Sequence, residues 1–306
     1  HYASVLEVAP NLGIALSTDG VGSKLVVAEQ ADRLEGVGID CVAMNVNDVV
    51  CVGAEPIALL DYLAVEEPDP KRLARIGEGL RAGAQLAGVE VPGGELAVLP
   101  ELIRGHPSPH GFDLCATAIG TVALDALVTG ERIEPGDALV GLPSSGLHSN
   151  GYTLARRALL DQGGLGLDDR PPELAGASVA DVLLEPTAIY VRAVLDLLRC
   201  GLSVHGLAHI TGGGIANLLR LSDEVGYRIE RPLPIPPIFG LVGRLGDVAE
   251  AELWDVFNMG CGFVAVVPAG HADDAVALLA AHHPGSARIG TVSDERGRVA
   301  APPGTG

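Results

Sequence analysis

The sequence is poor in aromatic residues, in lysine and in paired cysteines. Aromatic side chains make up only 3% of the 306 residues, while 48% of the chain is hydrophobic. The core must therefore be built from Val, Leu, Ile and Ala, and this hydrophobic content excludes wholesale disorder. At a typical size of about 150 residues per domain, the length predicts two domains or one large one.

Positive charge is also scarce. The chain has 20 Lys and Arg against 39 Asp and Glu, which gives a net charge of −19, and Lys24 and Lys71 are its only lysines. Such a negative field repels phosphate backbones and excludes non-specific binding to nucleic acid. An anionic ligand must be held by local groups, so a lysine inside a glycine-rich loop is a candidate for that role.

The five cysteines are scattered and form no C-x-x-C pair, which indicates a reducing, cytoplasmic compartment. The longest run without Asp, Glu, Lys or Arg is Cys200–Leu219, which contains five glycines, two histidines and an asparagine. This run predicts no transmembrane helix. No secretory signal is visible. The chain starts with His1 rather than Met, so we expect further sequence upstream.

Strand and helix patterns alternate in both halves of the chain, which predicts an α/β or α+β fold. A shift in composition at 130–137 predicts a linker between a domain of residues 1–130 and a domain of residues 131–306. We expect strands at 12–17, 57–65, 113–124, 138–142, 263–267 and 288–292, helices at 38–52, 70–87, 185–199 and near 271–282, and a loop at 92–95.

The motif Thr18–Lys24 (TDGVGSK) has the composition of a phosphate-binding turn. Gly20 and Gly22 let the backbone approach a ligand, and Lys24 supplies a positive charge. Asp19 has the carboxylate that Mg²⁺ prefers beside phosphate oxygens. The motif lacks the spacing of a Walker A loop, and an ordinary tight turn is the alternative.

The predicted helix at 38–52 carries Asn45, Asn47 and Asp48 among apolar neighbours. An unpaired carboxylate in a buried helix costs several kcal/mol, so Asp48 must be paired, metal-bound or at a cleft. Satisfaction by a helix cap or a backbone group is the alternative. The predicted loop Gly93-Gly94-Glu95 presents a further carboxylate, with an ordinary loop as its alternative.

Two later loops combine glycine with hydrogen-bonding side chains in front of predicted helices. They are Ser144–Gly151 (SSGLHSNG) and His209–Gly214 (HITGGG). Free N–H groups at a helix start favour an anion, which predicts ligand binding at both loops. The alternatives are an N-cap role for Ser149 or Asn150, close packing of the glycines, and a core position for His209.

Taken in order, TDGVGSK, GIDCVAMNVNDVVCVGAEP with LLDYLA, PGGE, SSGLHSNGY, LLEPTAIYV, HITGGG and FNMGCG resemble one known family. The resemblance is to the phosphoribosylformylglycinamidine cyclo-ligases, also called aminoimidazole ribonucleotide synthetases, and it extends from Leu12 to Val292. It implies two α/β domains, of which the first binds ATP and dimerises. It also implies Mg²⁺- and ATP-dependent ring closure of formylglycinamidine ribonucleotide by a cytoplasmic homodimer, with no role for nucleic acid or membrane.

The resemblance also implies roles for individual residues. Lys24, Asp48, His148 and His209 would be catalytic, with Lys24 neutralising the transferred phosphoryl group and a histidine moving a proton. Asp19, Asp48 and Glu95 would hold the metal. The nucleotide would contact Thr18, Asp19, Gly20, Gly22, Lys24, Asn47, Asp48, Gly93, Gly94 and Glu95. The substrate would contact Ser144, Ser145, Gly146, His148, Ser149, Asn150, Thr211, Gly212, Gly213 and Gly214.

The chain departs from the family at two places, and rival functions remain open. Leu96 stands where the family usually has Thr, and the family has a longer, glycine-rich N-terminal segment. The rivals are other ATP-using enzymes of the superfamily: selenophosphate synthetase, thiamine-monophosphate kinase, hydrogenase-maturation protein and the amidotransferase-linked synthetase of the preceding purine step. A non-catalytic nucleotide-binding protein is a rival from another class. The loops SSGLHSNGY and HITGGG favour the cyclo-ligase.

Overall fold

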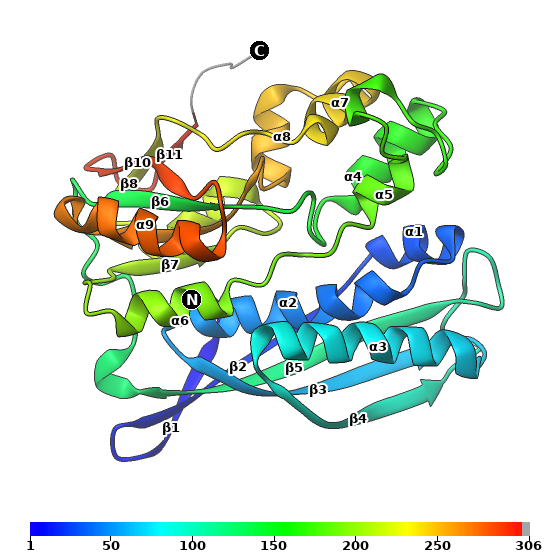
Figure 1. Ribbon diagram of the computed structural model, residues 1–306, viewed down its shortest axis with the longest axis horizontal. Helices are drawn as coiled ribbons and strands as arrows, with labels where there is room; N and C mark the ends of the chain where they lie inside the picture. Colours follow the sequence, from blue (N-terminus) through cyan, green and yellow to red (C-terminus); the bar gives the residue numbers. More distant parts are fainter. Residues whose placement is uncertain (302–306) are drawn as a thin grey trace.

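The computed structural model describes residues 1–301 and contains two β-sheets, each with its own helices (Figure 1). Residues 302–306, the end of the predicted second domain, lie outside the described part. The expected mixed α/β class with two domains is confirmed.

The first sheet has five strands in the order β1-β2-β5-β3-β4, with β3 and β4 parallel and the other pairs antiparallel. Alternating burial along β2 and β5 shows that one face of this sheet is covered and the other is open. The strands are β1 (Ser4–Ala9), β2 (Leu12–Gly20), β3 (Glu55–Val65), β4 (Glu90–Val98) and β5 (Phe112–Ala123).

The second sheet has six strands in the order β11-β8-β10-β6-β9-β7. Its strand β9, between β6 and the edge strand β7, is buried at every position, as expected for a strand covered on both faces. The strands are β6 (Ala138–Pro143), β7 (Gly206–His209), β8 (Gly226–Ile229), β9 (Cys261–Val267), β10 (Ala287–Ser293) and β11 (Val299–Ala300).

Helices α2 and α3 cover one face of the first sheet, and α2 lies between that sheet and the second domain (Figure 1). The helices are α1 (Lys24–Ala31), α2 (Glu35–Cys51), α3 (Pro70–Ala87), α4 (Tyr152–Arg156), α5 (Val179–Leu183), α6 (Val191–Arg199), α7 (Pro237–Gly246), α8 (Glu250–Val256) and α9 (Ala272–His282). Gly38 of α2 is required here, because a Cβ on it would overlap the backbone nitrogen of Leu80 in α3.

The strands expected from the sequence are confirmed, and so is the helix at 70–87. Asp69 accepts hydrogen bonds from the first-turn N–H groups of α3, and Gly88 ends the helix in the left-handed region. Two expectations are wrong: residues 92–95 belong to strand β4 rather than a loop, and the helix expected at 185–199 begins only at Val191. Within the described part of the chain, every helix is too short or too polar to span a lipid bilayer.

Candidate active site

Helix α2 holds the backbone of Asp19 in place through Asn45. The backbone N–H of Asp19 donates to Oδ1 of Asn45 (2.9 Å), and Nδ2 of Asn45 donates to the Asp19 carbonyl (3.1 Å). The buried amide of Asn45 therefore pairs with the end of β2 as a neighbouring strand would. Burial raises the pKa of Asp19, the Gly20 N–H opposes that rise, and the nearby charge of Asp48 adds to it. Asp19 and Asp48 thus lie close enough to repel each other.

Asp48 is held from the second domain. Nδ1 of His209 lies 2.9 Å from Oδ1 of Asp48, and the imidazole is fully buried. On the other side of the ring, Nε2 lies 3.4 Å from Nδ2 of Asn47. With Asn47 as the donor, Nε2 accepts and Nδ1 carries the proton that faces Asp48. His209 therefore orients the carboxylate from behind and does not itself reach solvent.

Asn47 is used at the domain interface. Its Oδ1 accepts the backbone N–H of Tyr190 (2.9 Å), and its Nδ2 donates to the carbonyl of Ala188 (2.9 Å). Each polar side chain of the Asn-x-Asn-Asp cluster therefore has a hydrogen-bond partner. Asn45 holds β2, Asn47 holds the segment before α6, and Asp48 faces His209.

The loop Ser144–Gly151 satisfies many of its polar groups internally. Nε2 of His148 accepts the Ser145 N–H (3.2 Å), and Oγ of Ser144 donates to Oδ1 of Asn258 (2.9 Å). Nδ2 of Asn258 in turn donates to the carbonyl of Gly146 (2.8 Å). Burial lowers the pKa of His148 well below its usual value, and nearby His209 and Lys24 lower it further. His148 is thus a neutral, buried side chain.

Asn150 brings this loop next to the loop His209–Gly214. A Cβ on Gly212 would lie 3.3 Å from Oδ1 of Asn150, which sets the two loops side by side. The backbone N–H of Thr211 donates to Oδ1 of Asn217 (2.7 Å). Gly214 has a positive φ, and a Cβ there would overlap the Trp254 carbonyl, so packing requires this glycine.

Lys24 lies elsewhere than the sequence predicts. Its side chain is fully buried, and Nζ lies 2.8 Å from Oδ2 of Asp40. Nζ also donates to the carbonyls of Glu185 (2.7 Å) and His148 (3.1 Å). The ammonium has no surface open to a ligand in this structure. Asp40, a buried carboxylate one helical turn before Met44, was not singled out from the sequence.

Glu95 is separated from the other two predicted metal ligands. It is exposed on β4 opposite Tyr62 of β3, on the open face of the sheet. Asp19 shares the covered face with the buried Ala15 and Ser17. Among residues 1–301, no three His, Cys, Asp or Glu side chains come together as a metal site. One chain therefore brings Asp19 to Asp48 but leaves Glu95 apart.

Asp61 is a candidate that sequence reasoning missed. In the ladder it is opposite Ala116, which is also opposite Asp19, so the two aspartates share a row, with their backbones about 10 Å apart. Burial raises the pKa of Asp61. The signal was present in LLDYLA, where alternation places Asp61 on the same face as the buried Leu59 and Leu63.

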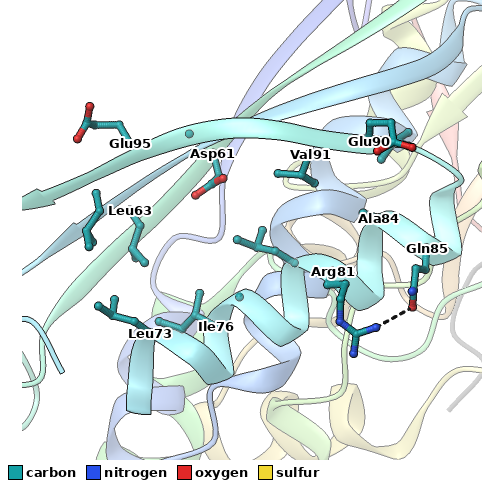
Figure 2. Close-up of a pocket in the computed structure, with 15 residues that line it drawn as sticks. Asp61, Leu63, Leu73, Ile76, Arg81, Ala84, Gln85, Glu90, Val91 and Glu95 are labelled. Atoms are coloured by element: carbon teal, nitrogen blue, oxygen red, sulfur yellow. Dashed lines mark hydrogen bonds between the residues drawn. The ribbon is translucent and has the colours of Figure 1, made fainter. Parts of the chain in front are cut away.

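A cavity of about 700 Å³ lies between α3 and strands β3 and β4, and Asp61 points into it (Figure 2). Its walls are mostly apolar, and Glu95 points away from it. The apolar lining includes Leu63, Leu73, Ile76, Leu80, Ala84, Val89, Val91 and Leu96. A cavity of this size and lining is typical of a small-ligand site.

The open face of the first sheet is apolar. We call it the apolar sheet face: six side chains of β1, β2 and β3 that are between 37% and 61% exposed, namely Leu6, Val8, Leu12, Leu16, Leu60 and Tyr62. Large apolar side chains exposed on one face of a sheet are typical of an interaction site. The face lies on the side of the sheet away from α2 and the second domain (Figure 1).

Comparisons with known proteins agree along the whole chain. The model of the AIR synthase related protein N-terminal domain matches residues 1–122, and that of the C-terminal domain matches residues 134–301. A phosphoribosylformylglycinamidine cyclo-ligase from Methanothermobacter thermautotrophicus is 49% identical over 98% of this chain and 85% of its own. One from Thermococcus gammatolerans is 50% identical over 97% of this chain and 84% of its own.

The fold is also found among solved structures. Hydrogenase maturation protein HypE in complex with ATP superposes with a TM-score of 0.64 at 24% identity, over 94% of this chain and 78% of that one. At this identity the likeness concerns the fold alone. Identity of 49% and 50% to cyclo-ligases, against 24% to the hydrogenase maturation protein, favours the cyclo-ligases over this rival.

Proposed function

The chain belongs to the AIR synthase related protein family, and from this premise we propose that it closes formylglycinamidine ribonucleotide to 5-aminoimidazole ribonucleotide in purine biosynthesis. The observation that carries the proposal is the identity of 49% and 50%, over nearly the full chain, to relatives named as cyclo-ligases. ATP phosphorylates the formyl amide oxygen of the substrate. This step leaves ADP as the first product. An amidine nitrogen then attacks the formyl carbon, and phosphate leaves with the former amide oxygen. Phosphorylation is needed because oxide is a poor leaving group.

Asp19 and Asp48 are the proposed Mg²⁺ ligands. The fit rests on the chemistry of the donors: burial raises the pKa of Asp19 and the charge of Asp48 adds to that rise, and a divalent cation would offset both effects. Bound Mg²⁺ would neutralise the phosphate charge of ATP. His209 contacts the carboxylate of Asp48, and Asn45 holds the backbone of Asp19.

The cavity under β4 is the proposed site for the adenine of ATP. Its apolar walls suit a flat base, while Arg81, Gln85 and Glu90 supply hydrogen-bonding groups at one end. Asp61 and Gly94 form the other end, in the ladder row that leads to Asp19. A nucleotide base in this cavity would lie beside Asp61, whose row on the sheet also holds Asp19.

The two loops of the second domain are the proposed substrate site. Asn150 and Gly212 adjoin each other and lie on the side of α2 that carries Met44 and Asp48. The net charge of −19 leaves the substrate phosphate dependent on local donors, which the glycines of the loop His209–Gly214 supply as backbone N–H groups. The dyad of His209 and Asp48 is the proposed route for the proton of the attacking nitrogen.

Residues 1–130 form the proposed ATP-binding and dimerising domain of a cytoplasmic homodimer, and residues 131–306 form the other domain. The apolar sheet face supports association with a second copy. Strand β4 ends the sheet order, so it is an edge strand within the described structure.

The test is incubation of the purified full chain with ATP, Mg²⁺ and formylglycinamidine ribonucleotide. We expect stoichiometric 5-aminoimidazole ribonucleotide, ADP and phosphate. A parallel panel with selenide and thiamine monophosphate covers the rival enzymes, and ATP binding without turnover of any substrate would identify a non-catalytic protein. Either of those results would overturn the proposal.

A further inference from the structure

We propose that Lys24, Asp40 and Thr187 form an interdomain clamp that positions the substrate loop Ser144–Gly151, so that Lys24 is a positioning residue and does not contact ATP. The inference rests on the proposed function, because it assigns a role within that reaction. It changes the role that the resemblance implies for Lys24, and it gives a role to Asp40 and Thr187.

The ammonium of Lys24 has three protons and three groups that accept them. One is the carboxylate of Asp40, with Oδ1 at 2.9 Å and Oδ2 at 2.8 Å. The others are the carbonyls of Glu185 at 2.7 Å and His148 at 3.1 Å. With its side chain 0% exposed, Lys24 retains no donor for a phosphate.

Asp40 extends the clamp to the second domain. Its Oδ1 accepts both the backbone N–H (2.7 Å) and the hydroxyl (2.6 Å) of Thr187. Thr187 Oγ1 lies 3.1 Å from Oγ of Ser149, inside the substrate loop. Helix α2 is thereby tied to the segment before α6, and that segment is tied to the loop.

The clamp acts on the part of the loop with the least favourable backbone. His148 has a φ of 62°, a conformation that L-residues seldom adopt without support. Its carbonyl is the group that accepts from Lys24. Ser149 and Asn150 follow directly, and Asn150 adjoins Gly212 in the second substrate loop. A charge-assisted bond at His148 therefore sets the direction in which Asn150 points.

A buried ion pair responds to mutation in a characteristic way, which supplies the test. Removing one partner leaves an uncompensated buried charge, whereas neutralising both is far better tolerated. We would measure thermal unfolding, kcat, and KM for each substrate in wild type, Lys24→Met, Asp40→Asn and the double variant. The Asp40→Asn substitution keeps an oxygen for the Thr187 N–H. The matched control is Arg33→Met, which removes an exposed ion pair with Asp181 across the same two domains.

The clamp predicts that each single variant raises the KM for formylglycinamidine ribonucleotide at least tenfold and leaves the KM for ATP within twofold. Both single variants should unfold at lower temperature. The double variant should recover most of the lost melting temperature, because no unpaired charge stays buried, while its KM for formylglycinamidine ribonucleotide stays raised, because a methionine in place of Lys24 cannot donate to the His148 carbonyl. Arg33→Met should change neither KM nor kcat/KM more than twofold. If Lys24→Met fails to fold, Thr187→Val is the substitute, with a raised substrate KM and an unchanged ATP KM.

A lowered kcat with an unchanged KM for formylglycinamidine ribonucleotide in Lys24→Met would overturn the proposal, because Lys24 would then act on the reacting groups. A raised KM for ATP in either single variant would overturn it as well. Failure of the proposed function looks different. Wild type would then make no aminoimidazole product, while the melting temperatures of the four proteins would still report whether Lys24 and Asp40 are coupled.

Discussion

The two faces of the first sheet differ in what they present. The covered face carries Asp19 and Asp61 toward α2 and α3, and the far side of α2 presents polar groups to the second domain. The open face presents mainly large apolar side chains at its exposed positions on β1, β2 and β3. The proposed catalytic groups and the proposed assembly surface therefore lie on opposite faces of the sheet. Strand β4 contributes to both, because it lines the cavity with Gly94 and carries Glu95 at an open edge.

The covered face can be tested most strongly at Asp48. Asp48→Asn retains an oxygen for His209 but removes the charge, so we expect kcat to fall about a thousandfold, or about 4 kcal/mol in the activation free energy. The assay is formation of 5-aminoimidazole ribonucleotide, with the melting temperature as a check on folding. Full activity would remove Asp48 from the site and leave the polar face as an interface only.

The open face can be tested at Leu60. Leu60→Glu buries a charge twice in a two-fold interface, so we expect the dimer dissociation constant to rise about a hundredfold, or about 3 kcal/mol. Light scattering during size-exclusion chromatography measures this change. Leu102→Glu, at an exposed residue outside the apolar sheet face, is the control. Dimers that resist Leu60→Glu but dissociate with Leu102→Glu would contradict the assignment.

The glycine loop on the covered side combines packing with binding, and two alanine variants separate the roles. Gly214→Ala forces a positive φ on alanine and a clash with the Trp254 carbonyl, so the free energy of unfolding should fall about 2 kcal/mol more than in Gly212→Ala. Urea unfolding measures both. Equal losses would mean that Gly214 is not a packing requirement.

The smallest effect concerns an exposed contact between the domains. The Ser178 N–H and hydroxyl, with Arg33, hold the pKa of Asp181 at about 2. Because the pKa of Asp181 is lower in the folded chain than in the unfolded chain, where it is about 4, its ionised carboxylate stabilises the fold above about pH 4. This stabilisation is lost as the pH falls through about 2. Asp181→Asn should therefore cost about 1 kcal/mol at pH 7, because solvent screens the pair and a cap is lost.

The unfolding free energies of Asp181→Asn and wild type should then converge near pH 2. Asp168→Asn, at an exposed aspartate, should match wild type throughout. A difference between Asp181→Asn and wild type that is constant with pH would show that the carboxylate charge is not involved.

Elements with local signals were predictable from the sequence. Helix α3 combines an apolar stripe, an N-cap and a terminal glycine within 20 residues, so its bounds follow from nearby residues alone. Strand β4 was not predictable in this way, because Pro92, Gly93 and Gly94 are turn residues by composition. They are tolerated since β4 is an edge strand, and Gly94 is needed because a Cβ there would overlap Oδ1 of Asp61.

The site was predictable by residue type but not by partner. The motifs suggested Asp19 and Asp48, and α2 packs directly beneath β2, so the charge of Asp48 adds to the rise that burial causes in the pKa of Asp19. The role of Lys24 depends on Asp40 and on carbonyls more than 100 residues away, which no local spacing reveals. The same contacts hold residues 185–187 out of α6, so a helical pattern there gave way to tertiary hydrogen bonds.

The most direct test of the central claim follows one oxygen atom. Formylglycinamidine ribonucleotide labelled with ¹⁸O in the formyl group is turned over with ATP, Mg²⁺ and the full chain, and the released phosphate is examined by mass spectrometry. Phosphorylation of the amide oxygen predicts one ¹⁸O in every phosphate formed together with aminoimidazole ribonucleotide. Unlabelled phosphate accompanying that product would contradict the account.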